Sequence, residues 1–189
     1  MSDPSRRGHA ETLALGESPA RYRTLVLSND HAGVALRGVA RQVMSAMCHE
    51  LVDLGMNDEA PVDFPDVTAA AVRMILRGDA ERAVLVCGTG AGACIAANKV
   101  PGIRAAVCHD TYVARQAVIH DDINVLCIGA WIVGPQIAAQ AIWAFLDAVH
   151  STEPHFRRRV AKLTELERLT PDSALEDLAR SVPVSESGR

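Results

Sequence analysis

A cysteine followed at once by three alternating glycines is the feature of this chain best able to do chemistry. Cys87 precedes Gly88, Gly90 and Gly92, and the apolar run Ala83–Val86 precedes the cysteine. Such a run is typical of a strand buried on both faces of a parallel sheet, and the glycines are expected to turn the chain into a helix. A thiol at a strand terminus that faces amide N–H groups and a helix N-terminus is placed to ionise and to meet an anion.

The glycines allow other interpretations. Gly88-x-Gly90-x-x-Ala93 after a strand, with Asp110 about twenty residues further on, nominally satisfies the dinucleotide-binding fingerprint. A second interpretation is purely structural: tight packing of a helix on a strand would also need small residues at these glycine positions. Cys87 and Thr89 favour a third interpretation, because they place a potential base and a hydroxyl around one anion-sized hole.

Cysteines are more often small buried hydrophobes than catalysts, and only the position before Gly-Thr-Gly sets Cys87 apart. The other four cysteines have no such setting, and we assign them to the core: Cys48, Cys94, Cys108 and Cys127. Five is an odd number, and the chain has no C-x-x-C pair. A disulfide framework and a structural zinc site are therefore not expected, which makes a reducing cytoplasm the default compartment.

Two further sites carry histidine beside acidic residues. Asp30 and His31 follow the predicted strand Thr24–Leu27, where Asp30 could act as a helix N-cap or bind a ligand. His120 is followed by two acidic residues, Asp121 and Asp122. It could simply complement a helix C-terminus, or the neighbouring carboxylates could orient it for acid–base work.

Strands and helices alternate between residues 21 and 170. The predicted strands are 24–27, 50–53, 83–86, 103–107 and 124–128, and the predicted helices are 34–47, 65–76, 91–99, 111–119, 135–148 and 155–169. This succession predicts one α/β domain with a doubly wound five-stranded parallel sheet, a Rossmann-like three-layer sandwich, and an extra C-terminal helix. Residues 1–20 and 171–189 lack periodicity and are expected to be flexible extensions.

Composition agrees with that class. Hydrophobic residues make up 49% of the 189 residues but aromatic residues only 4%, so the core must consist of Ala, Val, Leu and Ile. A net charge of −4 leaves no broad positive field for nucleic acid, and no apolar run reaches the roughly 20 residues of a membrane span. In such sheets ligands bind at the carboxyl ends of strands near a topological switch point, where Asp30, Cys87 and Cys108-His-Asp110 are all expected.

Several short motifs in the right order resemble the sugar-phosphate isomerase family of type B ribose-5-phosphate isomerase and galactose-6-phosphate isomerase. They are Asp30-His-Ala-Gly33, Asp63-Phe-Pro-Asp66, Cys87-Gly-Thr-Gly-Ala-Gly92, Ala96-Ala-Asn-Lys-Val-Pro-Gly-Ile-Arg104, Cys108-His-Asp-Thr-Tyr112 and Asn124-Val-Leu-Cys-Ile-Gly129. The similarity covers about residues 24–168 and overrides the dinucleotide interpretation. It implies an aldose–ketose isomerase that needs neither a metal nor an organic cofactor.

The resemblance also implies roles for individual residues. Cys87 would move the proton between C2 and C1, and Thr89 with the Gly88, Gly90 and Gly92 amides would hold the enediolate oxygen. His120 would help to open the sugar ring. The substrate-binding residues would be Asp30, His31, Asp121 and Arg159. The family forms dimers or tetramers in which His120 and the basic helix start reach the site from a neighbouring subunit.

The chain departs from the family pattern where the substrate would bind. Gly129-Ala-Trp131 stands in place of Gly-x-Arg, and His155-Phe-Arg-Arg-Arg159 in place of Arg-His-x-x-Arg, so that only Arg159 keeps its position. Asp121 replaces a usual Asn, Met56 a common Thr, and Ser28-Asn29 a usual Gly. Arg157 and Arg158 point in other directions on a helix and could equally be a solvated basic turn.

The sequence therefore predicts an isomerase of a four- to six-carbon sugar phosphate, with ribose 5-phosphate the first candidate. Its partners would be this small molecule and further copies of the chain, in a homodimer or homotetramer with shared sites, and neither nucleic acid nor membrane. A sugar-phosphate-binding module with little turnover and a nucleotide-binding Rossmann domain are the rival hypotheses.

Overall fold

The computed structural model describes residues 20–169, so the two expected extensions lie almost wholly outside the described residues. Five parallel strands form one sheet in the order β2-β1-β3-β5-β4. The elements in chain order are β1 (Tyr22–Asn29), a short 3-10 helix η1 (His31–Gly33), α1 (Val34–Ser45), β2 (Cys48–Asp53), α2 (Phe64–Arg77), β3 (Arg82–Cys87), α3 (Ala91–Asn98), β4 (Ala105–Val107), α4 (Thr111–Asp121), β5 (Val125–Gly129), α5 (Pro135–Asp147) and α6 (Pro154–Leu166). The α/β class, the strand count and the extra C-terminal helix are confirmed.

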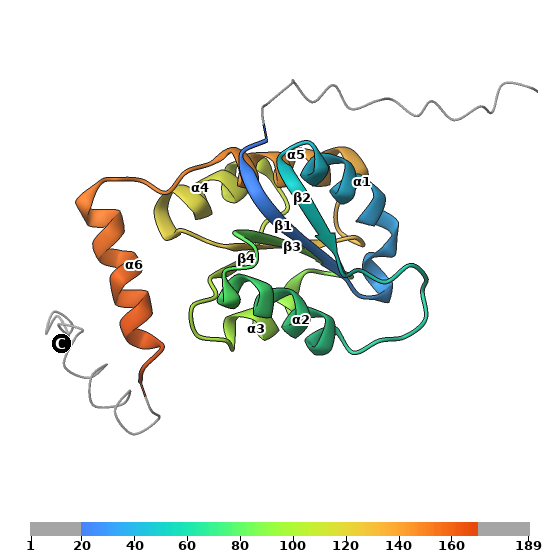
Figure 1. The fold of residues 1–189 in the computed structure, drawn as a ribbon, viewed down its shortest axis with the longest axis horizontal. Coiled ribbons are helices and arrows are strands. Elements are labelled where there is room, and N and C mark those ends of the chain that lie inside the picture. Colours follow the sequence, from blue (N-terminus) through green and yellow to red (C-terminus); the bar gives the residue numbers. More distant parts are fainter. Residues whose placement is uncertain (1–19, 170–189) are drawn as a thin grey trace, which may run out of the picture.

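Helices cover both faces of the sheet, with α1, α4 and α5 on one side and α2 and α3 on the other (Figure 1). Alternate residues of each strand supply the two cores, as the period of two in a strand requires. On β3, Val84 and Val86 face the first layer, whereas Leu85 and Cys87 face the second. Phe145 is the one aromatic residue among the largest fully buried side chains, so the described core is aliphatic as its composition predicted.

Element ends differ from the sequence prediction by a few residues. β1 is longer than predicted because its central place between β2 and β3 gives both edges of the strand hydrogen-bond partners. β4 begins at Ala105 instead of residue 103, since the Arg104 amide donates to the Asn124 side chain at 2.9 Å and not to a strand. No helix within residues 20–169 is long and apolar enough to cross a membrane.

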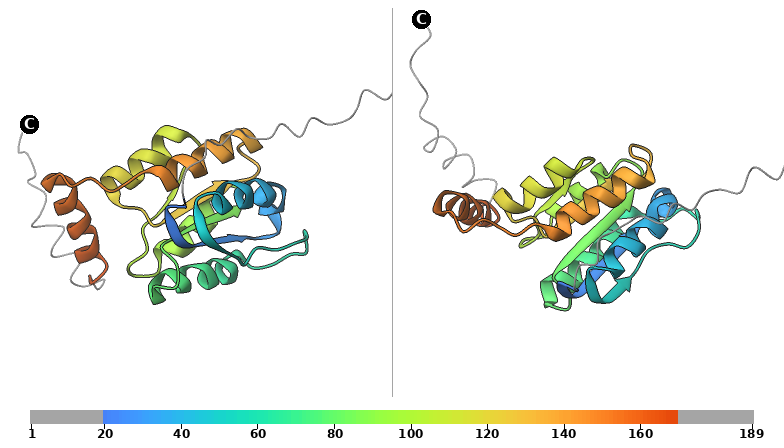
Figure 2. Two further views of the ribbon diagram at one scale, coloured as in Figure 1. Left: turned by 45° about the horizontal axis from the view of Figure 1, so that its top comes forward. Right: turned by 90° about the horizontal axis from the view of Figure 1, so that it is seen from above.

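The helix α6 stands away from the sheet and touches the rest of the fold mainly through α4 (Figure 2). None of its residues is buried, and Leu163 and Leu166 are 40% and 52% exposed. Within residues 20–169, these two leucines therefore do not enter a buried core.

Candidate active site

Cys87 is the last residue of β3 and its side chain is 6% exposed. The Gly90 N–H donates to its sulfur at 3.0 Å. Gly90 has a φ of 82°, a left-handed conformation that favours glycine, and there the chain turns into α3. The glycine loop thus folds back on the thiol that precedes it, as the sequence predicted.

Asp30 lies beside this loop, because β1 and β3 are neighbours in the sheet and the chain leaves β1 and β3 on opposite sides. The Asp30 amide donates to the Val86 carbonyl at 3.2 Å, one residue before Cys87. Its carboxylate, 7% exposed, accepts from the Gly33 amide at 3.0 Å and so caps the following helix. The switch point of the sheet, between β1 and β3, therefore brings Asp30 close to the Cys87 loop.

The next residue, His31, is held by its Nδ1 atom, which accepts from the Val62 amide at 3.3 Å. A ring nitrogen that accepts belongs to a neutral imidazole, so the proton is on Nε2. His31 thus keeps one N–H donor available at the carboxyl edge of the sheet.

Thr89 sits at the exposed tip of the loop, with its hydroxyl oxygen accepting from the Ala91 amide at 3.3 Å. This loop lies directly against the end of β5. A methyl group at Gly129 would lie 2.7 Å from the Thr89 carbonyl carbon, so only glycine permits that approach. The hydroxyl proton and the amides of Gly92 and Ala93, which follow Ala91 in the first turn of α3 and have no intrahelical acceptors, remain as donors.

Two aromatic rings flank the glycine loop. A methyl group at Gly88 would lie 2.7 Å from the Trp131 ring, and one at Gly92 would lie 3.1 Å from the Phe64 ring. Asp30, Phe64 and Cys87 are among the residues that line a cavity of about 10 Å³, the space of roughly one water molecule. Phe64 therefore lines this cavity, whereas Trp131 contacts the loop outside it.

His109 also belongs to this region, where the sequence placed the stretch Cys108-His-Asp110 without indicating a role for the histidine. Its Nε2 atom accepts from the Gly129 amide at 3.0 Å, and Gly129 is the register partner of Cys87. A histidine directly after a predicted strand was the available signal. Its neighbour Asp110 caps α4 by accepting from the Val113 amide at 2.8 Å.

That cap also bears on the dinucleotide hypothesis. Asp110 follows the edge strand β4, and β5 separates β4 from β3. The acidic residue of a dinucleotide site belongs to the strand next to the glycine-bearing one. The spacing in sequence was therefore misleading, because it does not report strand order.

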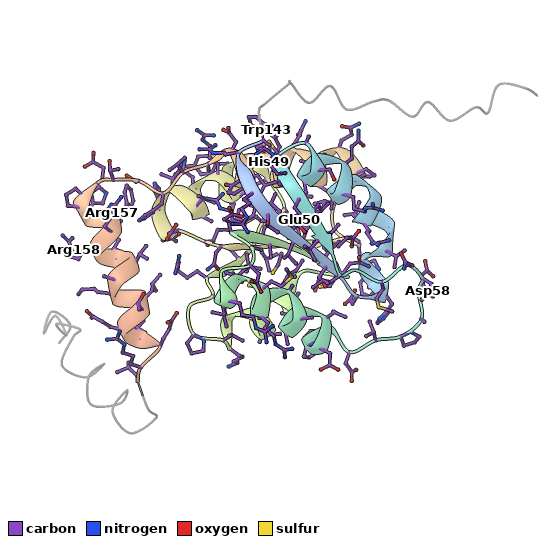
Figure 3. The ribbon with its side chains drawn as sticks, viewed as in Figure 1. His49, Glu50, Asp58, Trp143, Arg157 and Arg158 are labelled. Atoms are coloured by element: carbon purple, nitrogen blue, oxygen red, sulfur yellow. The ribbon has the colours of Figure 1, made fainter. Side chains whose placement is uncertain are left out.

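His120, Asp121 and Arg159 are not brought to this edge within one chain. His120 lies in the last turn of α4, which returns toward the strand starts, and its ring stacks on Phe156 at 4.2 Å between centroids. The Arg159 guanidinium lies 5.7 Å from the centroid of the same Phe156 ring. Arg157 and Arg158 at the start of α6 lie across the molecule from Asp58, which is on the loop after β2 (Figure 3).

Three other thiols differ in their environments. Burial raises the pKa of Cys108 to about 12, and a hydrogen bond to Cys94 with burial raises that of Cys127. The same Cys127 hydrogen bond lowers the pKa of Cys94 to about 7 against the opposing effect of burial. Cys108 and Cys127 are core residues as predicted, whereas Cys94 is only half-buried and receives an Asn98 N–H at 3.4 Å.

Comparison with known proteins agrees with this geometry. Residues 25–163 match the family described as Ribose/Galactose Isomerase. The chain is 37% identical over 127 residues to D-erythrulose-4-phosphate isomerase of Pectobacterium atrosepticum, covering 66% of this chain and 83% of that protein. It is 35% identical over 141 residues to ribose-5-phosphate isomerase B of Escherichia coli, covering 74% and 93%.

Solved structures give the same result. Type B ribose 5-phosphate isomerase of Leishmania infantum superposes with a TM-score of 0.74 at 35% identity, over 77% of this chain and 96% of that one. The chain therefore belongs to the ribose/galactose isomerase family and is an aldose–ketose isomerase.

Proposed function

We propose that this enzyme interconverts the aldose and ketose forms of a sugar phosphate at the Cys87 edge of the sheet. Ribose 5-phosphate and ribulose 5-phosphate are the first candidates, followed by other four- to six-carbon sugar phosphates. The observation that carries the proposal is the Cys87 sulfur, held at 3.0 Å by the Gly90 amide in a residue that lines the same small cavity as Asp30. The relatives' named substrates, ribose 5-phosphate and erythrulose 4-phosphate, support the same class.

In the proposed reaction the Cys87 thiolate takes the proton from C2 of the open-chain aldose. The C2–H electron pair becomes the C1=C2 double bond, and the carbonyl oxygen O1 becomes the enediolate oxygen. Sulfur then returns the proton to C1, while the O2 proton passes to O1 and O2 becomes the ketose carbonyl. Thr89 and the loop amides stabilise the oxygen charge, and closure of the site by the proposed partner subunit would keep water from the carbon acid.

Asp30 and His31 supply groups for the rest of the molecule. The Asp30 carboxylate can accept from sugar hydroxyls, and the His31 Nε2–H can donate to a phosphate oxygen. Both lie one strand from the sulfur, on the β1 side of the switch point.

The remaining functions need a second copy of the chain. His120 would assist ring opening, and Asp121 and Arg159 would contact the substrate, from α4 and α6 of a neighbouring subunit. An α6 with no buried residue and two exposed leucines supports such a homodimer, or a tetramer built from it. The partner would then cover the apolar side of α6 and close the site.

The test is a panel of aldose and ketose phosphates of four to six carbons, each with its unphosphorylated sugar, assayed in D₂O. We expect turnover of the phosphorylated sugars only, with solvent deuterium incorporated at the carbons between which the proton moves. Binding of these sugars with neither turnover nor exchange would overturn the proposal.

A further inference from the structure

Trp131 has a backbone that is bound directly to the catalytic loop. Its amide donates to the Gly88 carbonyl at 2.9 Å, and the preceding Ala130 amide donates to the Cys87 carbonyl at 2.8 Å. The Ile132 and Val133 amides both return to the Gly129 carbonyl and close the turn. The position of Trp131 is therefore set by the same two peptide groups that carry the reactive thiol.

The indole ring lies over Gly88. The Cβ that this glycine lacks would fall 2.7 Å from Cε3 and Cζ3 of the ring and 2.9 Å from Cη2. One part of the six-membered ring is thus held against the loop, yet 73% of the side chain remains exposed. A single exposed aromatic residue is ordinary on a surface, but one clamped on both its backbone and its ring beside the reactive group is placed to meet a ligand.

The Trp131 indole offers different chemistry from the charged side chains of an anion-binding site. An indole has no charge and its one N–H donor cannot replace a bidentate guanidinium–phosphate contact. Its face binds polarised C–H groups and excludes water, which suits the carbon chain of a sugar. Arg37 and Arg41 do not compensate, since both are paired with Asp53 at 3.0 and 3.1 Å at the end of β2, which β1 and β3 separate from β5.

We infer that Trp131 is a specificity-determining residue of the isomerase site, an aromatic platform against which the C–H face of the sugar stacks while the phosphate is held elsewhere. This inference rests on the proposed function. It assigns recognition of the carbon chain to β5 and recognition of the phosphate to the His31 side and to a neighbouring subunit.

Kinetics of Trp131→Ala and Trp131→Phe test the role, with Trp143→Phe on α5 as the matched control. We expect Trp131→Ala to raise KM for the best sugar phosphate of the panel about tenfold while kcat changes much less, and Trp131→Phe to keep most of the affinity. Inhibition by inorganic phosphate should be the same in all three variants and the parent enzyme. An unchanged KM in Trp131→Ala, or an equal loss of phosphate inhibition, would overturn the inference.

Fluorescence keeps the test independent of turnover. The chain has two tryptophans, so Trp143→Phe leaves Trp131 as the sole tryptophan, which is excited selectively over the two tyrosines. Ribose 5-phosphate or erythrulose 4-phosphate should change its emission, and inorganic phosphate should not. If no sugar phosphate is turned over, the proposed function fails. Binding can be detected separately as thermal stabilisation. A sugar phosphate that stabilises the protein without altering the Trp131 emission would contradict the role of Trp131 as a platform.

Discussion

The Gly90 amide hydrogen points at the Cys87 sulfur across 3.0 Å, so the loop that follows the thiol also holds it. A thiol free to rotate would have to be positioned at each turnover. Here the position is set by a short turn with glycine at the one residue of positive φ. The thiol proposed as the base and the loop proposed to bind the oxyanion are therefore held together by this turn.

Replacing Cys87 by alanine should remove isomerisation with little effect on the fold. Loss of the base is expected to lower kcat by about 10³-fold, the usual size of a proton-transfer contribution. Steady-state rates measure this, and thermal stabilisation by sugar phosphate measures whether binding survives. The buried Cys48→Ala provides the control, and activity retained in Cys87→Ala would remove this sulfur from the mechanism.

Glycine is required at the end of β5 but not in the middle of α1. Gly129→Ala would push a methyl group to 2.7 Å from the Thr89 backbone and should destabilise the protein by about 1–3 kcal/mol. Gly38→Ala meets nothing within 4 Å and should stabilise it by about 0.5–1 kcal/mol, since alanine favours a helix. Urea unfolding of both variants measures whether the free energy of unfolding falls for Gly129→Ala and rises for Gly38→Ala. Equal changes in the two variants would show that the protein tolerates a methyl group between Gly129 and Thr89.

Cys94 should react with iodoacetamide at lower pH than an ordinary thiol. Its pKa is lowered from 9.0 to about 7 by the Cys127 hydrogen bond, so its thiolate fraction rises through pH 7 instead of pH 9. Peptide mass mapping after short exposures at pH 6 to 9 follows this site, with Cys94→Ser as the blank. Cys108, with a pKa raised to about 12, should stay unlabelled throughout, and a Cys94 midpoint near 9 would contradict the assignment.

Two inactive variants should complement each other if sites are shared between subunits. His120→Phe keeps a ring to stack on Phe156 while removing the titratable nitrogens. After co-refolding with Cys87→Ala, half of randomly formed dimers are mixed and hold one intact site, so about a quarter of the normal activity should return. Activity that never rises above that of the separate variants would show that Cys87 of one subunit and His120 of another do not form one site.

The order of elements and the turn that follows Cys87 were predictable from the sequence. Short continuous apolar runs bounded by turn residues, such as Ala83–Val86, favour strands buried on both faces, and glycine after the cysteine allows the positive φ that the turn into the helix needs. Asp30 at the strand end was predictable for the same reason, because carboxyl ends of parallel strands share one edge. These are local patterns, and each is contained in a few neighbouring residues.

Strand order and ring contacts were decided only by the tertiary structure. Because β5 lies between β3 and β4, Trp131 reaches Gly88 and His109 reaches Gly129, while Asp110 is carried to the far edge. Because α4 runs back along the sheet, His120 ends at the opposite side of its own chain from Cys87. Which residues meet across strands depends on the free energy of packing the whole sheet. The spacing of residues along the chain does not determine these contacts.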